Sequence, residues 1–206
     1  MKKFIAFTLS EILIAIGIIG VIGTLTIPNI AKTYERRALL AKAKSTFKDL
    51  SIAFQGIDEV LYRAQREKTS SQSLPYKTLL LLGEDKLSFM SGPSATQEHF
   101  YSGEIKYYNG SSETPNLNGD ASGVLQGNID IDLYIPSSGV AGSNISSGPY
   151  AGSKYRGYLY FDTNGKSNGP NMRNVDIFLA RIVDDGLVLS EEQDNQGNFD
   201  DFPAFK

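Results

Sequence analysis

The amino-acid sequence of 206 residues predicts an α+β protein in which one long amino-terminal helix packs against a small antiparallel β-sheet. Three observations predict this class. Residues 12–31 carry no charge, an apolar stripe of helical spacing runs from Leu40 to Leu61, and segments typical of strands gather after residue 128. Strands that follow a helix without alternating with further helices favour an α+β arrangement over a parallel α/β sheet.

The uncharged segment 12–31 is long enough to cross a membrane, because a spanning helix needs about 20 residues. Lys2 and Lys3 precede it, which predicts a single-pass protein of the cell membrane with a cytoplasmic amino terminus and its head outside the cytoplasm. Three other interpretations explain less. A secretory signal peptide has a shorter apolar core, a plain anchor leaves Glu11 unexplained, and a buried helix of a soluble protein is usually shorter.

The sequence Lys-Lys-Phe-Ile-Ala-Phe-Thr-Leu-Ser-Glu, residues 2–11, resembles the processing site of type IV prepilins and of type II secretion pseudopilins. The resemblance implies that a prepilin peptidase removes residues 1–6 by cutting between Ala6 and Phe7, and that Phe7 is then N-methylated. It also implies that Glu11 is the acid at the fifth position of the mature chain. Ala6 differs from the Gly that the family usually has before the cut.

Glu11 lies four residues after Phe7, so the two side chains share one face of a helix. The implied cut frees an amine whose reference pKa is about 8, so this amine is mostly cationic at pH 7. A carboxylate inside a bilayer costs roughly 3 kcal/mol. A cation from a neighbouring subunit offsets that cost, because opposite charges attract strongly at low dielectric. We therefore predict that Glu11 pairs one subunit with the next during assembly.

The helix is predicted to continue from about Thr8 to Tyr62, and its amphipathic second half is expected to dock on a globular head. Glycines and Pro28 weaken the first half. We predict that Pro28 supplies softness that assembly requires, although Gly and Pro are also simply commoner in membrane helices. The apolar stripe of the second half consists of Leu40, Ala43, Phe47, Leu50, Phe54, Ile57 and Leu61.

The predicted organisation is a removed leader at 1–6, a helix at 7–62 and a pilin-like globular head at 63–206, which is large enough for one small core. The apolar segment 76–82 predicts either a short helix or a strand. Asp184-Asp185-Gly186 is typical of a hairpin turn. Strands are predicted at 129–135, 155–161, 175–183 and 187–189, and loops are predicted at 91–96, 109–123 and 137–153.

Oxygen-bearing side chains alternate along the segment 162–171, and such side chains can bind calcium. Some pseudopilin heads, which this segment resembles, use a calcium-bound loop near the carboxyl end. Lys166 disfavours a cation, and the Asn-Gly and Gly-Pro pairs also make ordinary turns, so a plain turn is the alternative. If calcium binds, we expect its ligands to include Asp162, Asn164 and Asp176.

Catalysis finds little support in the sequence, and we predict that the protein is not an enzyme. The chain has no Cys, its one histidine is His99, and it lacks a phosphate-binding Gly loop. Asp130 and Asp132 share one face of a predicted strand and are expected to face solvent. The net charge is −3, and removal of Lys2 and Lys3 would make it −5, so no basic surface for nucleic acid is predicted.

Together these observations predict a structural subunit of a type IV pilus-like filament that assembles through its amino-terminal helix, either a pseudopilin of a type II secretion system or a minor pilin. The filament is expected to be periplasmic or extracellular. Expected partners are copies of the chain or related pilins, a prepilin peptidase and methyltransferase, an inner-membrane assembly platform and membrane lipid. One alternative is a membrane-anchored binding or adhesion protein that does not polymerise, and a third is a tethered hydrolase.

Overall fold

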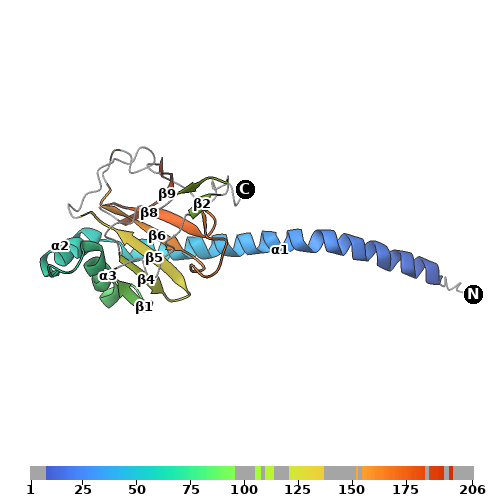
Figure 1. The fold of residues 1–206 in the computed structure, drawn as a ribbon, viewed down its shortest axis with the longest axis horizontal. Coiled ribbons are helices and arrows are strands. Elements are labelled where there is room, and N and C mark those ends of the chain that lie inside the picture. The colour runs from blue at the N-terminus through green and yellow to red at the C-terminus, as the bar shows by residue number, and fades with distance from the viewer. Residues whose placement is uncertain are drawn as a thin grey trace, which may run out of the picture. The chain divides into compact units, whose positions relative to one another are not determined.

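The computed structural model describes residues 8–95, 105–107, 110–113, 121–136, 152, 155–183, 186–192 and 195–196. Contacts divide the chain into two units, Met1–Ala38 and Leu39–Lys206. The described helices are α1 (Leu9–Ala53), α2 (Ile57–Glu67) and α3 (Leu74–Asp85) (Figure 1). The described strands are β1 (Phe89–Ser94), β2 (Ile105–Tyr107), β3 (Ser112–Glu113), β4 (Ala121–Leu125), β5 (Ile129–Tyr134), β6 (Gly157–Asp162), β7 (Met172–Arg173), β8 (Ile177–Val183), β9 (Gly186–Glu192) and β10 (Asn195–Gln196).

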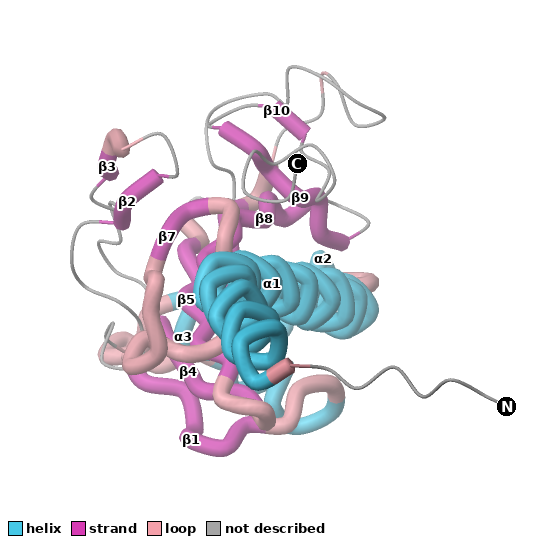
Figure 2. Tube along the Cα trace, turned by 90° about the vertical axis from the view of Figure 1, so that its right-hand side faces the viewer, coloured by secondary structure: helices cyan, strands magenta, loops and turns pink. Residues whose placement is uncertain are grey.

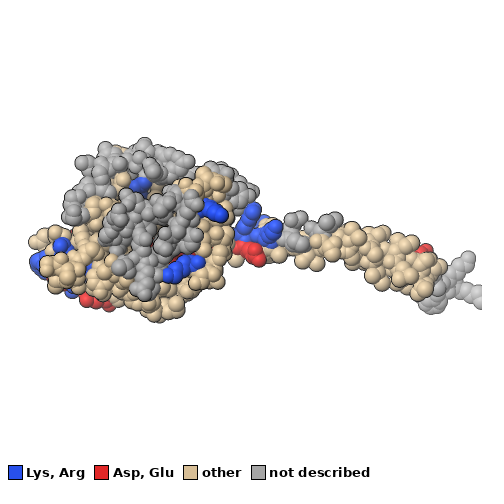
Figure 3. All heavy atoms as spheres, in the orientation of Figure 1, with Lys and Arg blue, Asp and Glu red and all other residues tan. Residues whose placement is uncertain are grey.

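The part of α1 that belongs to the smaller unit, residues 9–38, has a largely apolar surface, and we call it the apolar arm. No Asp, Glu, Lys or Arg occurs from residue 12 to residue 31. In the space-filling view the arm shows no charge over most of its length (Figure 3). Its large apolar side chains are exposed, with Leu9 at 77% and Ile19 at 69%. This surface is much larger than the single exposed apolar residues that are normal on soluble domains.

The predicted membrane-spanning segment at 12–31 is not borne out, because none of the described helices is both long enough and apolar enough to cross a membrane. This finding corrects three predictions. They are the membrane-embedded first half of the helix, the single-pass location in the cell membrane, and the later periplasmic or extracellular location.

The single helix expected from Thr8 to Tyr62 is divided in two. α1 ends at Ala53, and α2 begins at Ile57 after a short turn. Gly56 stands at the start of α2 with φ of +68°, a left-handed conformation that breaks the helix and that glycine adopts most easily. The apolar stripe continues across this break, since Phe54 and Ile57 are both fully buried. The stripe therefore marks the buried face correctly but does not reveal where the helix ends.

Helix α3 settles the choice between helix and strand for the segment 76–82. Ser73 precedes it, and the Ser73 hydroxyl accepts a hydrogen bond from the Tyr76 N–H at 3.3 Å. Pro75 occupies the first turn, where its missing N–H is not needed. Leu79 and Leu82 are fully buried, so α3 contributes one face to the core next to α2.

The sheet is larger and more mixed than the small antiparallel sheet that was predicted, so the predicted pilin-like fold class is wrong. It has ten described strands in the order β1-β4-β5-β6-β8-β7-β2-β3, with β9 beside β8 and β10 beside β9 (Figure 2). The pairs β2–β7 and β7–β8 are parallel, and the other pairs are antiparallel. Strand β3 falls within a segment that was predicted as a loop, and β1 and β4 overlap such segments.

The strand β4 shows why its segment was misread. Its sequence Ala-Ser-Gly-Val-Leu is buried at all five positions, so it has no polar face and no alternation. Gly123 within it lets the Phe89 ring lie close, because a Cβ at Gly123 would stand 2.9 Å from Phe89 Cδ1. Glycine serves here as a packing residue of a strand rather than as a turn signal.

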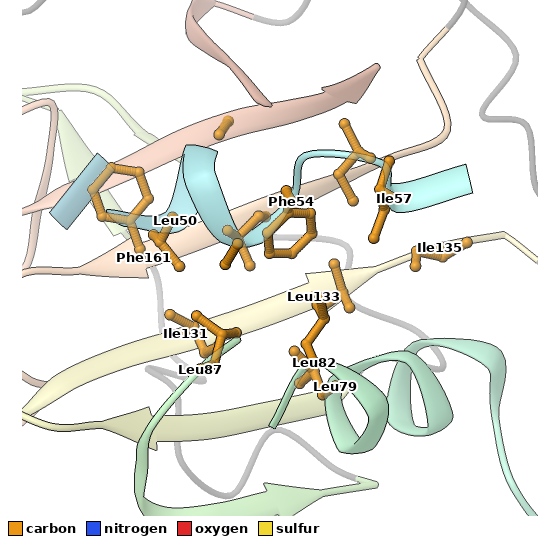
Figure 4. Packing of buried hydrophobic residues seen from close by; sticks show 14 of the residues in the cluster. Leu50, Phe54, Ile57, Leu79, Leu82, Leu87, Ile131, Leu133, Ile135 and Phe161 are labelled. Carbon is orange, nitrogen blue, oxygen red and sulfur yellow. The ribbon is translucent and has the colours of Figure 1, made fainter. Parts of the chain in front are cut away.

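One face of the sheet packs on the second part of α1, residues 39–53. Phe161 of β6 stacks on Phe178 of β8 with ring centroids 5.4 Å apart, and on Phe47 of α1 at 6.2 Å. Figure 4 shows Leu50 and Phe54 on the helix side of this core and Ile131 on the sheet side. The opposite face holds a second apolar cluster of Ile105, Tyr160, Ile177 and Leu179.

Substitution of Gly157, at the start of β6, tests the close approach of the central strands. A Cβ at Gly157 would collide with the carbonyl oxygen of Tyr134 and would lie 3.2 Å from Ile135 Cα. We expect Gly157→Ala to lower the free energy of unfolding by about 3 kcal/mol, because backbone cannot move aside as a side chain can. Urea unfolding of the full chain in a non-ionic detergent measures this change.

Gly92 of β1 provides the matched control, because a Cβ at Gly92 would meet nothing within 4 Å. Gly92→Ala should leave the stability unchanged or raise it by up to about 1 kcal/mol. Equal stability of the two variants would show that β5 and β6 are not in the described contact.

Candidate functional site

Three aspartates meet where the ends of the central strands adjoin. Asp130 of β5 pairs across the sheet with Asp162 of β6, and Asp162 pairs with Ile177 of β8. Asp176 immediately precedes Ile177, so the strand register brings all three residues to the same end of the three strands. Asp162 and Asp176 are fully buried and Asp130 is 3% exposed. We call Asp130, Asp162 and Asp176 the carboxylate cluster.

The segment 163–175 connects β6 to β8 and folds over the carboxylate cluster, and we call it the carboxylate loop. Three of its residues have positive φ: Gly165 at +82°, Asn171 at +52° and Asn174 at +59°. Gly and Asn are the residues that adopt this conformation at the lowest cost. The Gly and Asn content that indicated a turn in the sequence therefore also lets the main chain bend inward toward the aspartates.

Main-chain N–H groups of the carboxylate loop donate to all three aspartates. Asp162 Oδ1 accepts from Asn164 N at 3.0 Å and from Gly165 N at 3.1 Å. Asp176 accepts from Asn171 N at 2.8 Å and from Met172 N at 2.7 Å. Asp130 Oδ2 accepts from the N–H of Lys166 at 2.7 Å. These bonds fix the directions of the carboxylates but bring no positive charge.

The buried oxygen atoms at this place that have no hydrogen-bond partner include Oδ2 of Asp162 and Oδ1 of Asn164. The Asn164 amide nitrogen donates to Gly169 O at 3.1 Å, so its oxygen is the atom left without a donor. A buried acceptor without a partner costs stability, and a buried carboxylate oxygen costs more. The arrangement therefore has unused capacity to bind a donor or a cation.

The electrostatics of the cluster favour the same conclusion. Burial, together with repulsion by Asp176 and Asp130, raises the pKa of Asp162 to about 7, although the N–H groups of Asn164 and Gly165 oppose this rise. Burial also raises the pKa of Asp176, against the N–H groups of Met172 and Asn171. Both carboxylates are therefore less stable as anions than they would be in water.

The donor set fits a calcium ion in its chemistry. The structure brings together Asp162, Asn164 and Asp176, the residues predicted as ligands, and the Asn164 side chain also hydrogen-bonds to Asp176. Calcium takes six to eight oxygen ligands and accepts carboxylate, amide and main-chain oxygens. Within the described part of the chain, no group of three or more His, Cys, Asp or Glu side chains could hold a metal ion. A site here therefore depends on the amide and main-chain oxygens as well as on carboxylates.

The structure corrects the expectation that Asp130 and Asp132 face solvent. Both are buried, because the second face of the sheet is covered, and Asp132 is fully buried. The alternation at 129–135 correctly indicated the strand β5, but the polar positions of this strand are buried and do not face solvent. Sequence reasoning missed Asp130 as a member of the cluster because only the pairing of β5 with β6 brings it next to Asp162.

The other predicted site residues lie in or near the apolar arm. Ala6 and Phe7, the predicted processing site, are outside the described residues, as is His99. Pro28 lies within α1, but its side chain is outside the description. Glu11 is described, and it lies in the first turn of α1.

Glu11 forms a capping box with Thr8, the residue just before the helix. Glu11 Oε2 accepts from Thr8 N and from Thr8 Oγ1, both at 2.8 Å, and Glu11 N donates to Thr8 Oγ1 at 3.3 Å. The bond from the Thr8 main chain, followed by that from its hydroxyl, lowers the pKa of Glu11. Glu11 thus has a role within its own chain that does not involve the predicted partner amine.

Comparisons with protein-family models, curated proteins and solved structures find no match for this chain.

The raised pKa of Asp162 predicts how stability depends on pH. Between the unfolded pKa of about 4 and the folded pKa of about 7, the folded chain holds a proton that the unfolded chain has lost. Stability should therefore fall as pH rises through this window in the presence of EDTA. Asp162→Asn, which keeps the acceptor oxygen without the charge, should show a smaller fall. Urea unfolding of the full chain from pH 4.5 to pH 8 measures both profiles.

Asp49→Asn is the control for this comparison, since Asp49 is an exposed acid of α1. The Asp49 variant should follow the pH profile of the unchanged chain. Parallel profiles for the unchanged chain and Asp162→Asn would contradict the described burial of the Asp162 carboxylate.

Proposed function

We propose that this chain is a subunit of a type IV pilus-like filament, in which the apolar arm of each copy packs against the arms of other copies. The exposure of the arm's large apolar side chains carries this proposal. Burial of apolar surface contributes about 25 cal/mol per Å². Among the described side chains of the arm, eleven large aliphatic ones are exposed, listed here in chain order: Leu9, Ile12, Leu13, Ile14, Ile16, Ile18, Ile19, Val21, Ile22, Ile27 and Ile30.

The distribution of these residues favours several neighbours over one partner groove. The consecutive run Ile12, Leu13, Ile14 is exposed, and consecutive residues of a helix point in different directions. A helix that is apolar on all sides is stable only when it is surrounded. A helical array of identical copies surrounds each arm with other arms, and its contacts repeat without closing on themselves. Copies of the same chain therefore satisfy the arm better than a single partner does.

Glycines of the arm support close packing between copies. A Cβ added at Gly17 or at Gly20 would meet nothing within 4 Å in the chain itself. Each glycine costs about 1 kcal/mol of helix stability relative to alanine. Glycine is thus not required by contacts within the chain, and it leaves room for the backbone of a neighbouring helix.

Glu11 supplies the polar part of the proposed contact. Both hydrogen bonds from Thr8 end on Oε2 of Glu11, so Oε1 can accept from a further donor. If residues 1–6 are removed, as the resemblance to prepilins implies, the new amine of Phe7 is such a donor and carries a positive charge. Surrounding apolar arms would strengthen this pairing between copies by lowering the local dielectric.

Two substitutions of Glu11 separate the pairing from the capping of the helix. Glutamine can also serve at this position of a capping box, so Glu11→Gln keeps the cap and removes the charge. We expect both Glu11→Gln and Glu11→Ala to reduce filament formation in the native host at least about tenfold, because the charged partner is lost. Electron microscopy and quantification of sheared filaments measure the outcome, and mass spectrometry of the filament shows whether Phe7 is the methylated first residue.

Glu35→Ala is the matched control, because Glu35 is an exposed acid at the other end of the arm. Its filaments should form normally. Normal assembly by Glu11→Gln together with failure by Glu11→Ala would assign Glu11 to capping alone. If the native host makes the unchanged protein but forms no filaments, and every copy still begins at Met1, the proposed function is contradicted.

We also propose that the carboxylate cluster binds Ca²⁺ through Asp162, Asn164 and Asp176. Asp130 adds negative charge beside them, held by the Lys166 N–H. The bound ion would supply the positive charge that the buried carboxylates lack. The support for this proposal is that two ligand oxygens, Asp162 Oδ2 and Asn164 Oδ1, are buried without a hydrogen-bond partner. The cluster would then be a structural site that stabilises the larger unit.

Thermal unfolding of the full chain at pH 7.5 tests the calcium site. Calcium at 100 times its Kd should raise the free energy of unfolding by about 2.7 kcal/mol. Asp162→Asn should remove most of this gain, and Asp49→Asn should keep it. The gain should shrink toward pH 5, because protons compete for the same carboxylates. No stabilisation of the unchanged chain by calcium would contradict the proposed site.

A further inference from the structure

The turn between β4 and β5, residues 126–128, contacts both the carboxylate loop and α1. Asn128 Nδ2 donates to Asn164 O in the loop at 3.0 Å. On the other side of the turn, Lys42 Nζ of α1 donates to Gly127 O at 2.9 Å. Two adjacent residues thus join an element that belongs to the proposed cation site to the helix that carries the apolar arm.

The turn and the loop approach each other closely at Gly165 and Asn128. A Cβ at Gly165 would lie 3.0 Å from Asn128 Cγ and 3.1 Å from Asn128 O. Gly127 and Asn128 both have positive φ, at +86° and +57°. Few alternative conformations are open to a non-glycine residue in this region. A shift of Asn164 must therefore move Asn128, and Gly127 moves with it.

The hydrogen bond from Lys42 to Gly127 is one contact between the turn and α1. A hollow of about 240 Å³ lies beside them, lined by residues of α1, of the segment 86–88 and of the turn region: Thr46, Asp49, Leu50, Lys86, Leu87, Ser88, Leu125, Gln126 and Ile129. Side chains therefore do not fill the space beside helix and turn at this level. The hydrogen bond from Lys42 to Gly127 therefore joins α1 and the turn at a level where packing is incomplete nearby.

We propose that calcium binding at the carboxylate cluster is coupled, through the turn 126–128, to how firmly α1 is held on the sheet. The inference rests on the proposed calcium site and adds a regulatory role to it. In this scheme, bound calcium fixes the position of Asn164, whose main-chain oxygen accepts the hydrogen bond from Asn128. The neighbouring Gly127 oxygen is then held in place to accept the hydrogen bond from Lys42. A filament built on α1 transmits force through this helix, so the larger unit would hold its helix most firmly when the ion is bound. The coupling is reciprocal, so loss of the lysine weakens calcium binding.

Hydrogen–deuterium exchange of the full chain in a non-ionic detergent tests the coupling at pH 7.5, with calcium or with EDTA. In the unchanged chain, calcium should slow exchange of the α1 amides at residues 42–50 by about fivefold, the low end of typical couplings. Lys42→Met and Asn128→Ala should each abolish this calcium-dependent change. Lys42→Met should also raise the Kd for calcium by about fivefold, although Lys42 is not a ligand.

Two matched variants serve as controls. Lys48→Met removes an exposed lysine of the same helix and should keep the calcium-dependent protection. Asn168→Ala removes the other donor to Asn164 O, at 2.8 Å, which lies within the loop and does not reach the turn. It should also keep the protection of α1 if calcium still binds.

The outcomes separate this inference from the proposed site on which it rests. Calcium stabilisation of the unchanged chain without slower exchange in α1 would overturn the coupling and leave the calcium site standing. Protection that persists in Lys42→Met would overturn the coupling as well. Absence of any calcium effect on the unchanged chain would overturn both.

Discussion

The sheet is covered on both faces, and this constraint decides where the polar residues of the central strands lie. α1 covers one face through the stacked rings of Phe47, Phe161 and Phe178. On the other face, Ile105 packs against Tyr160 and its neighbours. An aspartate on these strands therefore has no solvent-exposed face of the sheet on which to lie. Its carboxylate must find donors inside the protein, and the main chain of the carboxylate loop provides them only in part.

The two functional proposals have a common physical form, because each begins with a group that the single chain leaves incompletely satisfied. The apolar arm exposes side chains that water solvates poorly, and other copies of the arm would cover them. The buried oxygens of Asp162 and Asn164 lack partners, and a cation would complete their coordination. Within the larger unit, the turn 126–128 is joined to α1 by the hydrogen bond from Lys42 to Gly127.

Sequence patterns located individual elements better than they located the fold. The strands β5, β6 and β8 lie where alternation and aromatic content predicted them. The apolar stripe through Phe54 identified the buried face. The helical spacing of apolar residues cannot by itself show that the helix is interrupted at Gly56. The strand β4 was missed because it is buried on both faces and contains glycine. The membrane segment was inferred by counting uncharged residues, and no described helix meets the requirements for a crossing.

The candidate site was predictable only in the part that is local in sequence. Asp162, Asn164 and Asp176 lie near one another along the chain, whereas Asp130 joins them through strand pairing.

The central claim is that arms of different copies touch, and disulfide cross-linking tests it most directly because the chain has no cysteine of its own. Ile16→Cys in the native host should give a ladder of covalent oligomers on oxidation, and Lys106→Cys on β2 should give none. Only monomer from Ile16→Cys, in cells that still make the protein, would contradict the account.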